Sequence, residues 1–412
     1  MKDRTLRLCL FSACGFLLLF HLQLFWALRD EALRGYSDFA AFYAAGKLVH
    51  LGPASGLYDY DQQARIQAAL FPQVQIRQAP LLYYHPPFEV LLFLPLSFLS
   101  YSTAYLLWVF LNLCILLALP WLLKPCVARL EITVRPLFPI LFLVFFPAFV
   151  ALIQGQDSVL LLLIFALALR SFSLDHQFKA GCVLALGLFK FQLALPFLVP
   201  FVLRCRWKLI TGWAFVAVVL ALFSTQIVGA RGVVQYLGFL WKLNQNLASL
   251  GNQETRAIYP SSMPNLRGVV YSLAAGKMPE SYLLLLIIII SVGLLLWTAT
   301  RRSWDRTEDS TAFNLSFALS LTVALLVSYH LQVHDLSLLS LRIIIVLNDA
   351  ISEDTSPKRL RVALMGASCA FLVSPVYLLL LRWGRLYLLF WPILLFAMGI
   401  AQRVAAAPRS AG

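Results

Sequence analysis

The chain has 412 residues, of which 61% are hydrophobic and only 13% are charged. This composition and a mean hydropathy of +0.80 exclude a soluble globular domain, and the many apolar runs of about 17–25 residues predict membrane-spanning helices. The net charge of +14 is then a topological signal, because Lys and Arg collect on cytoplasmic loops, and no basic stripe outside the hydrophobic segments indicates nucleic-acid binding.

The first apolar segment, residues 6–28, follows Lys2, Arg4 and Arg7. It is too long for the core of a signal peptide and lacks a small-x-small cleavage site, so we expect an uncleaved first span with a cytoplasmic N-terminus. The seven cysteines lie mostly inside or beside apolar runs and show no paired metal-ligand spacing. They are therefore interpreted as small buried hydrophobic residues.

The chain as a whole, 1–412, is predicted to be one all-α polytopic membrane domain of about twelve transmembrane helices, with both termini cytoplasmic. Segment 87–99 is too short to span and is interpreted as re-entrant. Segment 178–203 is interpreted as two short pieces meeting at residues 190–192, because a single span would place Arg204, Arg206 and Lys208 on the wrong side of the membrane. The other segments are 101–123, 136–153, 158–172, 207–228, 283–300, 312–328, 336–347, 361–381 and 386–403.

Two long intervals, about 29–87 and 229–280, are then extracytoplasmic loops. Within the first, aromatic residues recur at helical spacing after Asp38, which predicts a helix lying in the membrane interface. Asp59 followed by Gln62 resembles the start of a second short helix, which Pro72 would end. The second loop carries an aromatic amphipathic stretch over residues 236–247.

Polar clusters from distant parts of the chain fall on the extracytoplasmic side of this topology. Ionisable groups at membrane depth are costly and by default mark function. Because the topology was built from the Lys and Arg residues of the opposite side, the convergence is independent support for a site, apart from the placement of Lys190, which follows from dividing segment 178–203 into two pieces. The residues concerned are Asp38, Tyr84, His85, Gln154, Gln156, Asp157, Lys190, Gln192, Arg256, Arg267, His330, His334 and Asp335.

Several of these groups also have an ordinary structural explanation. Asp38 and Asp157 are of a type favoured at a helix start, and either could simply be a cap. His85 could cap a turn before the proline pair that follows it. Lys190 could extend its ammonium group to the lipid headgroups. Only the convergence of these residues on one side favours a catalytic or binding role over these structural alternatives.

His330 and His334 are four residues apart, so on a helix they would share one face. That spacing suits a metal pair, with Asp335 or Asp38 as a further ligand. No third imidazole is evident, and histidines that bind a phosphate or polarise Asp38 are the preferred interpretation. The sequence predicts no cofactor; it does not require a divalent metal but leaves room for one.

Four stretches, in their order and spacing over about residues 30–210, resemble the bacterial glycosyltransferase family 87. They are GYSDFAAFYAAGKLVHLG…LYD, YYHPPFEVLLFLPLSFLSYSTAYLLW, the Gly-Gln-Asp turn and LGLFKFQLALPFLVPFVL. Members of this family are C-type integral-membrane enzymes, similar to the polyprenol-phosphate-mannose-dependent α-mannosyltransferases. The resemblance implies a plasma-membrane enzyme with an extracytoplasmic active site and two loops that carry interfacial helices.

The resemblance also implies that a hexosyl residue, expected to be mannosyl, passes with inversion from a polyprenyl-phosphate-linked donor to a glycolipid or glycan acceptor. By motif, Asp38 is the general base, and His330 and His334 join it as catalytic candidates. A lipid-phosphate sugar carries its own leaving group, which agrees with the lack of a Gly-rich phosphate loop. The expected substrate- and phosphate-binding residues are Tyr84, His85, Gln156, Asp157, Lys190, Gln192, Arg256, Arg267 and Asp335.

Two other classes of protein compete with this interpretation. A transporter or flippase of a lipid-linked sugar would show paired broken helices in corresponding halves, and the sequence has broken segments but no internal symmetry. A non-catalytic membrane scaffold would leave the polar clusters apart in space. Whether the clusters meet in one place therefore discriminates the scaffold from the other two.

Overall fold

The computed structural model describes residues 2–52, 54–74, 80–135, 137–249, 260–301, 310–351 and 358–405. Within these ranges the chain is helical and contains no strand. The α-helices are α1 (Lys2–Glu31), α2 (Phe39–Leu51), α3 (Tyr60–Leu70), α4 (Val90–Phe93), α5 (Tyr101–Leu123), α6 (Ala128–Thr133), α7 (Phe138–Leu143), α8 (Phe146–Gln154), α9 (Ser158–Ser173), α10 (Gln177–Ala185), α11 (Phe191–Leu203), α12 (Trp207–Ser249), α13 (Leu266–Ala274), α14 (Glu280–Ala299), α15 (Ser310–Val327), α16 (Leu339–Ala350), α17 (Lys358–Ala370), α18 (Ser374–Arg382) and α19 (Phe390–Ala405).

Short tight segments connect or extend these helices. One is a π-helical turn, η1 (Ala32–Tyr36), which separates α1 from α2. The others are 3-10 helices: η2 (Ala54–Gly56), η3 (Pro87–Glu89), η4 (Pro95–Phe98), η5 (Lys124–Cys126), η6 (Leu186–Lys190), η8 (Pro260–Ser262), η9 (Val333–Leu338) and η10 (Leu386–Leu389).

Seven helical stretches in the described residues are long and apolar enough to cross a membrane, judged by length and composition alone, and the pair α17 and α18, bent by 61°, would make an eighth. One of the seven, Gln177–Leu203, comprises α10, η6 and α11, and the chain reverses within it. The prediction of a polytopic all-α protein is therefore confirmed. The predicted twelve spans are not all matched, because segments 136–153, 158–172 and 336–347 form shorter or broken helices. Segment 87–99, predicted to be too short for a span, contains only the short helices η3, α4 and η4. An apolar run of 12–18 residues does not tell a span from a short helix buried in a bundle.

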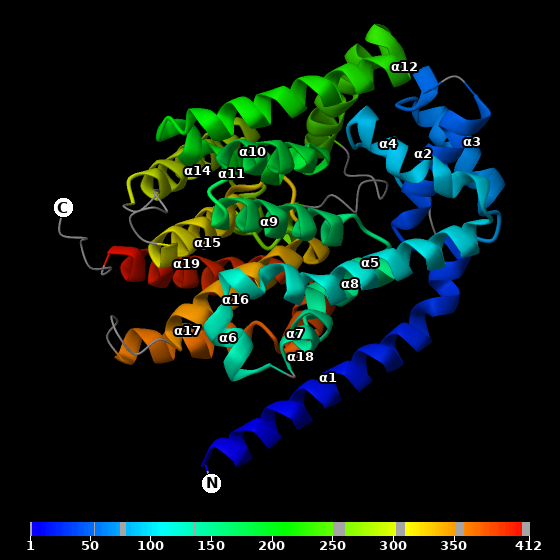
Figure 1. The fold of residues 1–412 in the computed structure, drawn as a ribbon. Coiled ribbons are helices and arrows are strands. Elements are labelled where there is room, and N and C mark those ends of the chain that lie inside the picture. Colours follow the sequence, from blue (N-terminus) through cyan, green and yellow to red (C-terminus); the bar gives the residue numbers. More distant parts are fainter. Residues whose placement is uncertain are drawn as a thin grey trace.

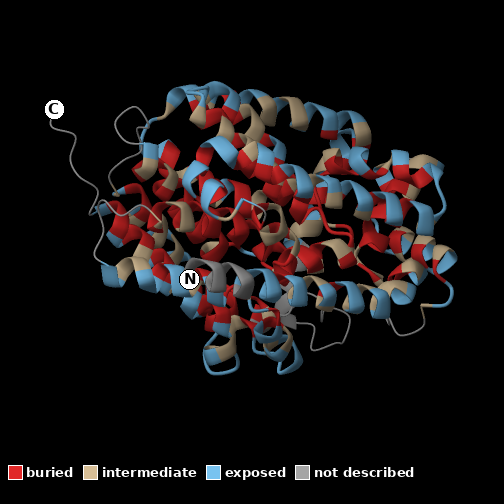
Figure 2. Ribbon diagram, turned by 60° about the horizontal axis from the view of Figure 1, so that its bottom comes forward, coloured by how far each residue is buried: buried red, intermediate tan, exposed pale blue. Residues whose placement is uncertain are grey.

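The long helices lie side by side as a bundle, with α2, α3 and α4 gathered at one end (Figure 1). We call this the α2–α4 end. Buried residues line the interior of the bundle, while exposed residues cover its outside (Figure 2). On α14 the exposed positions include Leu285, Ile288, Ile289 and Leu296. An apolar exterior around a packed interior is what a lipid environment requires.

The predicted reversal within 178–203 is confirmed. Gln177 begins α10 only a few residues after α9 ends, and the Phe201 ring near the end of α11 stacks on Phe172 of α9 at 5.6 Å. Both ends of the segment therefore lie at the same end of the bundle. Its middle, Lys190, contacts Ser158 at the start of α9, at the other end. The α-helical hydrogen bonding changes to the 3-10 pattern at η6, where the chain turns back.

Breaks in helical geometry lie near the predicted starts of the two loop regions. Gly229 breaks α12 with a φ of 72°, and Gly35 interrupts η1 with a φ of 98°. The Asp59 carboxylate accepts a hydrogen bond from the Gln62 backbone and caps α3, as predicted, and α3 ends at Leu70, before Pro72. The aromatic stretch that begins at residue 236 continues α12 rather than forming a separate helix.

Candidate active site

Asp38 occupies the position before α2, where a capping residue is expected, but its side chain makes no capping hydrogen bond. Instead, one carboxylate oxygen accepts a hydrogen bond from the Gln156 side-chain amide at 2.8 Å. The Asp38 backbone N–H donates to the side-chain oxygen of Gln154 at 3.1 Å. The position was predicted correctly, whereas the capping role is wrong: the half-buried carboxylate faces the turn between α8 and α9.

That turn can approach Asp38 so closely because of Gly155. This residue has a φ of 61°, in the left-handed region that favours glycine. A Cβ placed on it would lie 2.6 Å from the Cβ of Phe39. The missing side chain lets the turn pack on the start of α2, so that the two flanking glutamines, Gln154 and Gln156, both hydrogen-bond Asp38.

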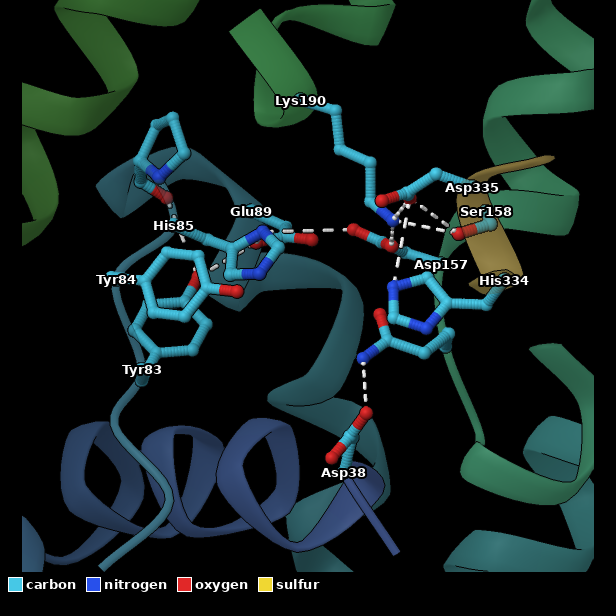
Figure 3. Close-up of polar contacts among 12 residues, drawn as sticks. Asp38, Tyr83, Tyr84, His85, Glu89, Asp157, Ser158, Lys190, His334 and Asp335 are labelled. Atoms are coloured by element: carbon cyan, nitrogen blue, oxygen red, sulfur yellow. Dashed lines mark hydrogen bonds and ion pairs between the residues drawn. The ribbon is translucent and has the colours of Figure 1, made fainter. Parts of the chain in front are cut away.

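Lys190 is the centre of a buried ionic cluster (Figure 3). Its ammonium group lies 2.7 Å from an oxygen of Asp157 and 2.5 Å from an oxygen of Asp335, and it donates to the Ser158 hydroxyl at 2.7 Å. The Ser158 hydroxyl in turn donates to Asp335 at 2.9 Å. All four side chains are at most 2% exposed. The three N–H bonds of the ammonium are matched by three acceptors from two separate chain segments.

The segment that carries Asp335 is fixed by its own backbone. The second carboxylate oxygen of Asp335 accepts a hydrogen bond from the Gln332 N–H at 3.0 Å, and the Gln332 side chain completes a capping box at the start of η9. This corrects the predicted shared helical face of His330 and His334. The helix begins only after Gln332, so His330 precedes it and His334 lies within it.

The two histidines still reach the same region. His334 lies between Asp335 and Asp38 (Figure 3), with its Nε2 3.6 Å from the Asp335 carboxylate. His330 Nε2 is 3.3 Å from the Tyr84 hydroxyl. Arg267 extends the group: its guanidinium stacks 3.9 Å over the Tyr329 ring and donates to the Tyr329 carbonyl. Arg267 is 2% exposed, and its Nε has no hydrogen-bond partner among the described residues.

Glu89 is a further member that sequence reasoning missed. Its carboxylate is fully buried, 2.8 Å from His85 Nδ1, and accepts a hydrogen bond from Tyr83 at 3.2 Å. His85 Nδ1 is also 3.6 Å from Asp157, so His85 connects Glu89 to the Lys190 cluster. A carboxylate four residues after a histidine, inside an apolar segment, was the available signal. His85, Glu89 and Asp157 are the described residues whose ligand atoms lie close enough for a metal ion.

Burial and charge set the protonation of these groups. Burial lowers the pKa of His85 and that of His330 to about 4, against the attraction of Asp157 and Asp335 respectively. Burial alone would raise the pKa of the Asp335 carboxyl, but the Lys190 ammonium holds that pKa well below its ordinary value. At neutral pH the site therefore contains neutral imidazoles beside an ionised aspartate.

Two expected members do not enter this arrangement. Gln192 lies two residues beyond Lys190 and is half-buried, but it makes none of the cluster's contacts within the described part of the chain. Arg256 lies outside the described residues. The others, Asp38, Tyr84, His85, Gln156, Asp157, Lys190, Arg267, His330, His334 and Asp335, gather at the α2–α4 end, so the polar clusters do meet in one place.

An all-helical membrane bundle with ionisable side chains gathered at one end defines a polytopic membrane protein with a polar site. The sequence model of glycosyltransferase family 87 matches residues 83–328, more than half of the chain. The chain belongs to this family and is a membrane glycosyltransferase. No curated protein and no solved structure matches it.

Proposed function

We propose that the protein transfers a hexosyl residue, in the first instance mannosyl, from a polyprenyl-phosphate-linked donor to a glycolipid or glycan acceptor. Transfer proceeds with inversion at the anomeric carbon. The α2–α4 end of the bundle faces the extracytoplasmic side of the plasma membrane, with both termini in the cytoplasm. The distribution of Lys and Arg supports this orientation, since Arg204 and Arg301 meet at the opposite end, where Arg204 donates to the Arg301 carbonyl.

The observation that carries the proposal is the contrast between Asp38 and its acidic neighbours. Asp157 and Asp335 are buried and committed to the Lys190 ammonium. Asp38 is half-exposed, is oriented by the neutral Gln156 amide, and pairs with no cation among the described residues. A carboxylate that is positioned but not neutralised can take the proton of an acceptor hydroxyl while the sugar–phosphate bond breaks.

The departing phosphate needs donors of its own. Lys190, expected from the sequence to bind it, has its three N–H bonds directed at protein acceptors. Arg267 and the His330–Tyr84 pair are better suited, because the Arg267 Nε has no partner in the described structure and His330 lies beside it. His334 lies between Asp38 and Asp335, and we assign it to hydrogen bonds with the sugar and the phosphate.

The test is an Asp38→Asn variant of the detergent-purified enzyme, assayed with a polyprenyl-phosphate sugar and an acceptor. Loss of the base should lower turnover by about 10²–10⁴-fold. Asp59→Asn is the matched control, because Asp59 starts the next helix of the same loop but only caps it, and it should transfer sugar at the wild-type rate. Near-wild-type turnover by Asp38→Asn would remove the proposed base. A donor that stays intact in the wild-type reaction would favour the flippase.

A further inference from the structure

Three buried side chains converge on one point beside the Lys190 cluster. His85 Nδ1 lies 2.8 Å from a Glu89 oxygen and 3.6 Å from an Asp157 oxygen, and one ligand atom from each residue falls within 4.8 Å of the others. Two ligands of a tetrahedral cation with bonds of about 2.0–2.1 Å are about 3.3 Å apart. The observed separations bracket that value, so small shifts would place the three atoms around one ion.

Each of the three side chains also makes a hydrogen bond or ion pair to a further group that fixes its orientation. The His85 ring hydrogen-bonds the Phe189 backbone carbonyl. Because Nδ1 faces the two carboxylates, the donor to this carbonyl is the Nε2–H group. The Tyr83 hydroxyl donates to Glu89, and the Lys190 ammonium holds the other oxygen of Asp157. Outer partners of this kind orient metal ligands, and a backbone carbonyl on the far nitrogen fixes the tautomer that frees the near one.

The cluster is short of positive charge. Glu89, Asp157 and Asp335 face a single ammonium group, that of Lys190, at the point where their contacts meet. The second Glu89 oxygen is fully buried and receives no hydrogen bond from an N–H or O–H donor of the described residues. The Glu89 carboxyl lies within hydrogen-bonding reach of the Asp157 carboxyl, and two such adjacent buried carboxyls need either a shared proton or a cation between them. Buried carboxylates are normally paired or bound to a cation. This oxygen without a donor is an observation separate from the acidic cluster itself.

We propose that His85, Glu89 and Asp157 bind a divalent transition-metal ion, with Zn²⁺ as the ion that fits best. One imidazole and two carboxylates are three protein ligands, which leaves a tetrahedral ion one open position for an oxygen ligand. The pair His330 and His334, whose spacing would suit a metal pair on one helix, is not this site: His330 contacts Tyr84, and the two residues lie in different local structures.

The experiment measures Zn²⁺ alone, without donor or acceptor, so its outcome is independent of sugar transfer. Full-length protein in detergent is stripped with a chelator, reloaded, and assayed for bound zinc by mass spectrometry and for affinity by calorimetry. Wild type should bind one equivalent. His85→Asn and Glu89→Gln should each weaken zinc binding by at least 10–100-fold. Glu89→Gln keeps the shape of the side chain and its contact with Tyr83, so it tests the proposed site even if His85→Asn does not fold.

Two variants serve as controls. His334→Gln removes the rival ligand pair, and His50→Gln removes a histidine of the same loop that bonds Ser97 instead; both should bind zinc like the wild type. The proposal is overturned if the wild-type protein binds no zinc, if Glu89→Gln binds it unchanged, or if His334→Gln is the variant that loses it. In those cases His85 and Glu89 share a proton and no metal.

Discussion

The Asp38 carboxylate and the Gln156 side-chain amide, 118 positions apart in the chain, are joined by a hydrogen bond of 2.8 Å. This contact links the first loop region to the turn between α8 and α9. Gln156 is followed directly by Asp157, which pairs with Lys190. The orientation of the proposed base therefore depends on a buried ionic cluster that it does not itself touch.

Gln156→Ala should lower the rate of sugar transfer by about tenfold or more, because the base loses the amide that orients it. The expected change is in kcat rather than in KM, which a steady-state assay with varied donor separates. Gln62→Ala, at a glutamine of α3 outside the site, is the control and should leave both constants unchanged. Equal losses in the two variants would mean that Gln156 supports only the fold.

Replacing Lys190 by Met should destabilise the protein by about 3–5 kcal/mol, because Asp157 and Asp335 would remain buried without a cation. Thermal unfolding in detergent measures the change. Lys190→Arg should not restore stability, since a planar guanidinium does not match three acceptors arranged around one ammonium. Lys47→Met, at a partly exposed lysine of α2, is the control.

A double variant tests whether Lys190 and Asp335 contribute to stability jointly rather than independently. In Lys190→Met with Asp335→Asn, one buried charge disappears together with its partner, so the double variant should be more stable than the sum of the two single changes predicts. Additive losses would show that Lys190 and Asp335 act independently and would contradict the description of one ionic unit.

The sequence was sufficient to predict which polar residues lie together, but it did not predict the contacts that they make with one another. Scarce charged groups in an apolar chain and the one-sided Lys and Arg pattern were enough to bring Asp38, Lys190 and Asp335 to one end. That Lys190 binds two carboxylates could not be predicted, because Asp157 and Asp335 reach it only through the packing of α9, η6 and η9. Glu89 was missed because it lies in a short apolar segment interpreted as entering the membrane.

The prediction from the i, i+4 spacing of two histidines was wrong because they do not lie on one helix. The spacing of His330 and His334 implies a common face only if both lie on one helix, and the capping box at Gln332 and Asp335 starts that helix between them. The reversal at Lys190 was predictable, because the charges at Arg204, Arg206 and Lys208 excluded a single crossing. The count of twelve spans was too high, because apolar runs such as 158–172 form short helices packed in the bundle, and the sidedness of the site stays a prediction.

Acidic pH should destabilise the protein through His330, whose pKa is about 4 when folded and near 6.5 when unfolded. Between these values the unfolded chain binds a proton that the folded protein does not, so stability is full above pH 6.5 and falls as the pH drops toward 4. Because the His330 ring is partly exposed, we expect about 1–2 kcal/mol. Thermal unfolding of wild type and His330→Gln at pH 7 and pH 5 measures it.

The His330→Gln variant should lose less stability than wild type over this interval and should keep the part of the slope that comes from His85. His176→Gln, at the turn between α9 and α10 on the opposite side of the bundle, is the matched control and should follow the wild type. Parallel curves for wild type and His330→Gln would show that His330 titrates alike in the folded and unfolded states.

Gly155→Ala should disturb the site without altering any functional group. The substitution places a side chain at a φ of 61° and 2.6 Å from the Phe39 Cβ. We expect a loss of at least about 1–2 kcal/mol of stability from the backbone conformation and, as the turn moves away from α2, a large fall in sugar transfer. Gly293→Ala, in the middle of α14 with no atom within 4 Å of the new Cβ, should be neutral or slightly stabilising. Full activity in Gly155→Ala would show that the turn does not need its close approach to position Asp38.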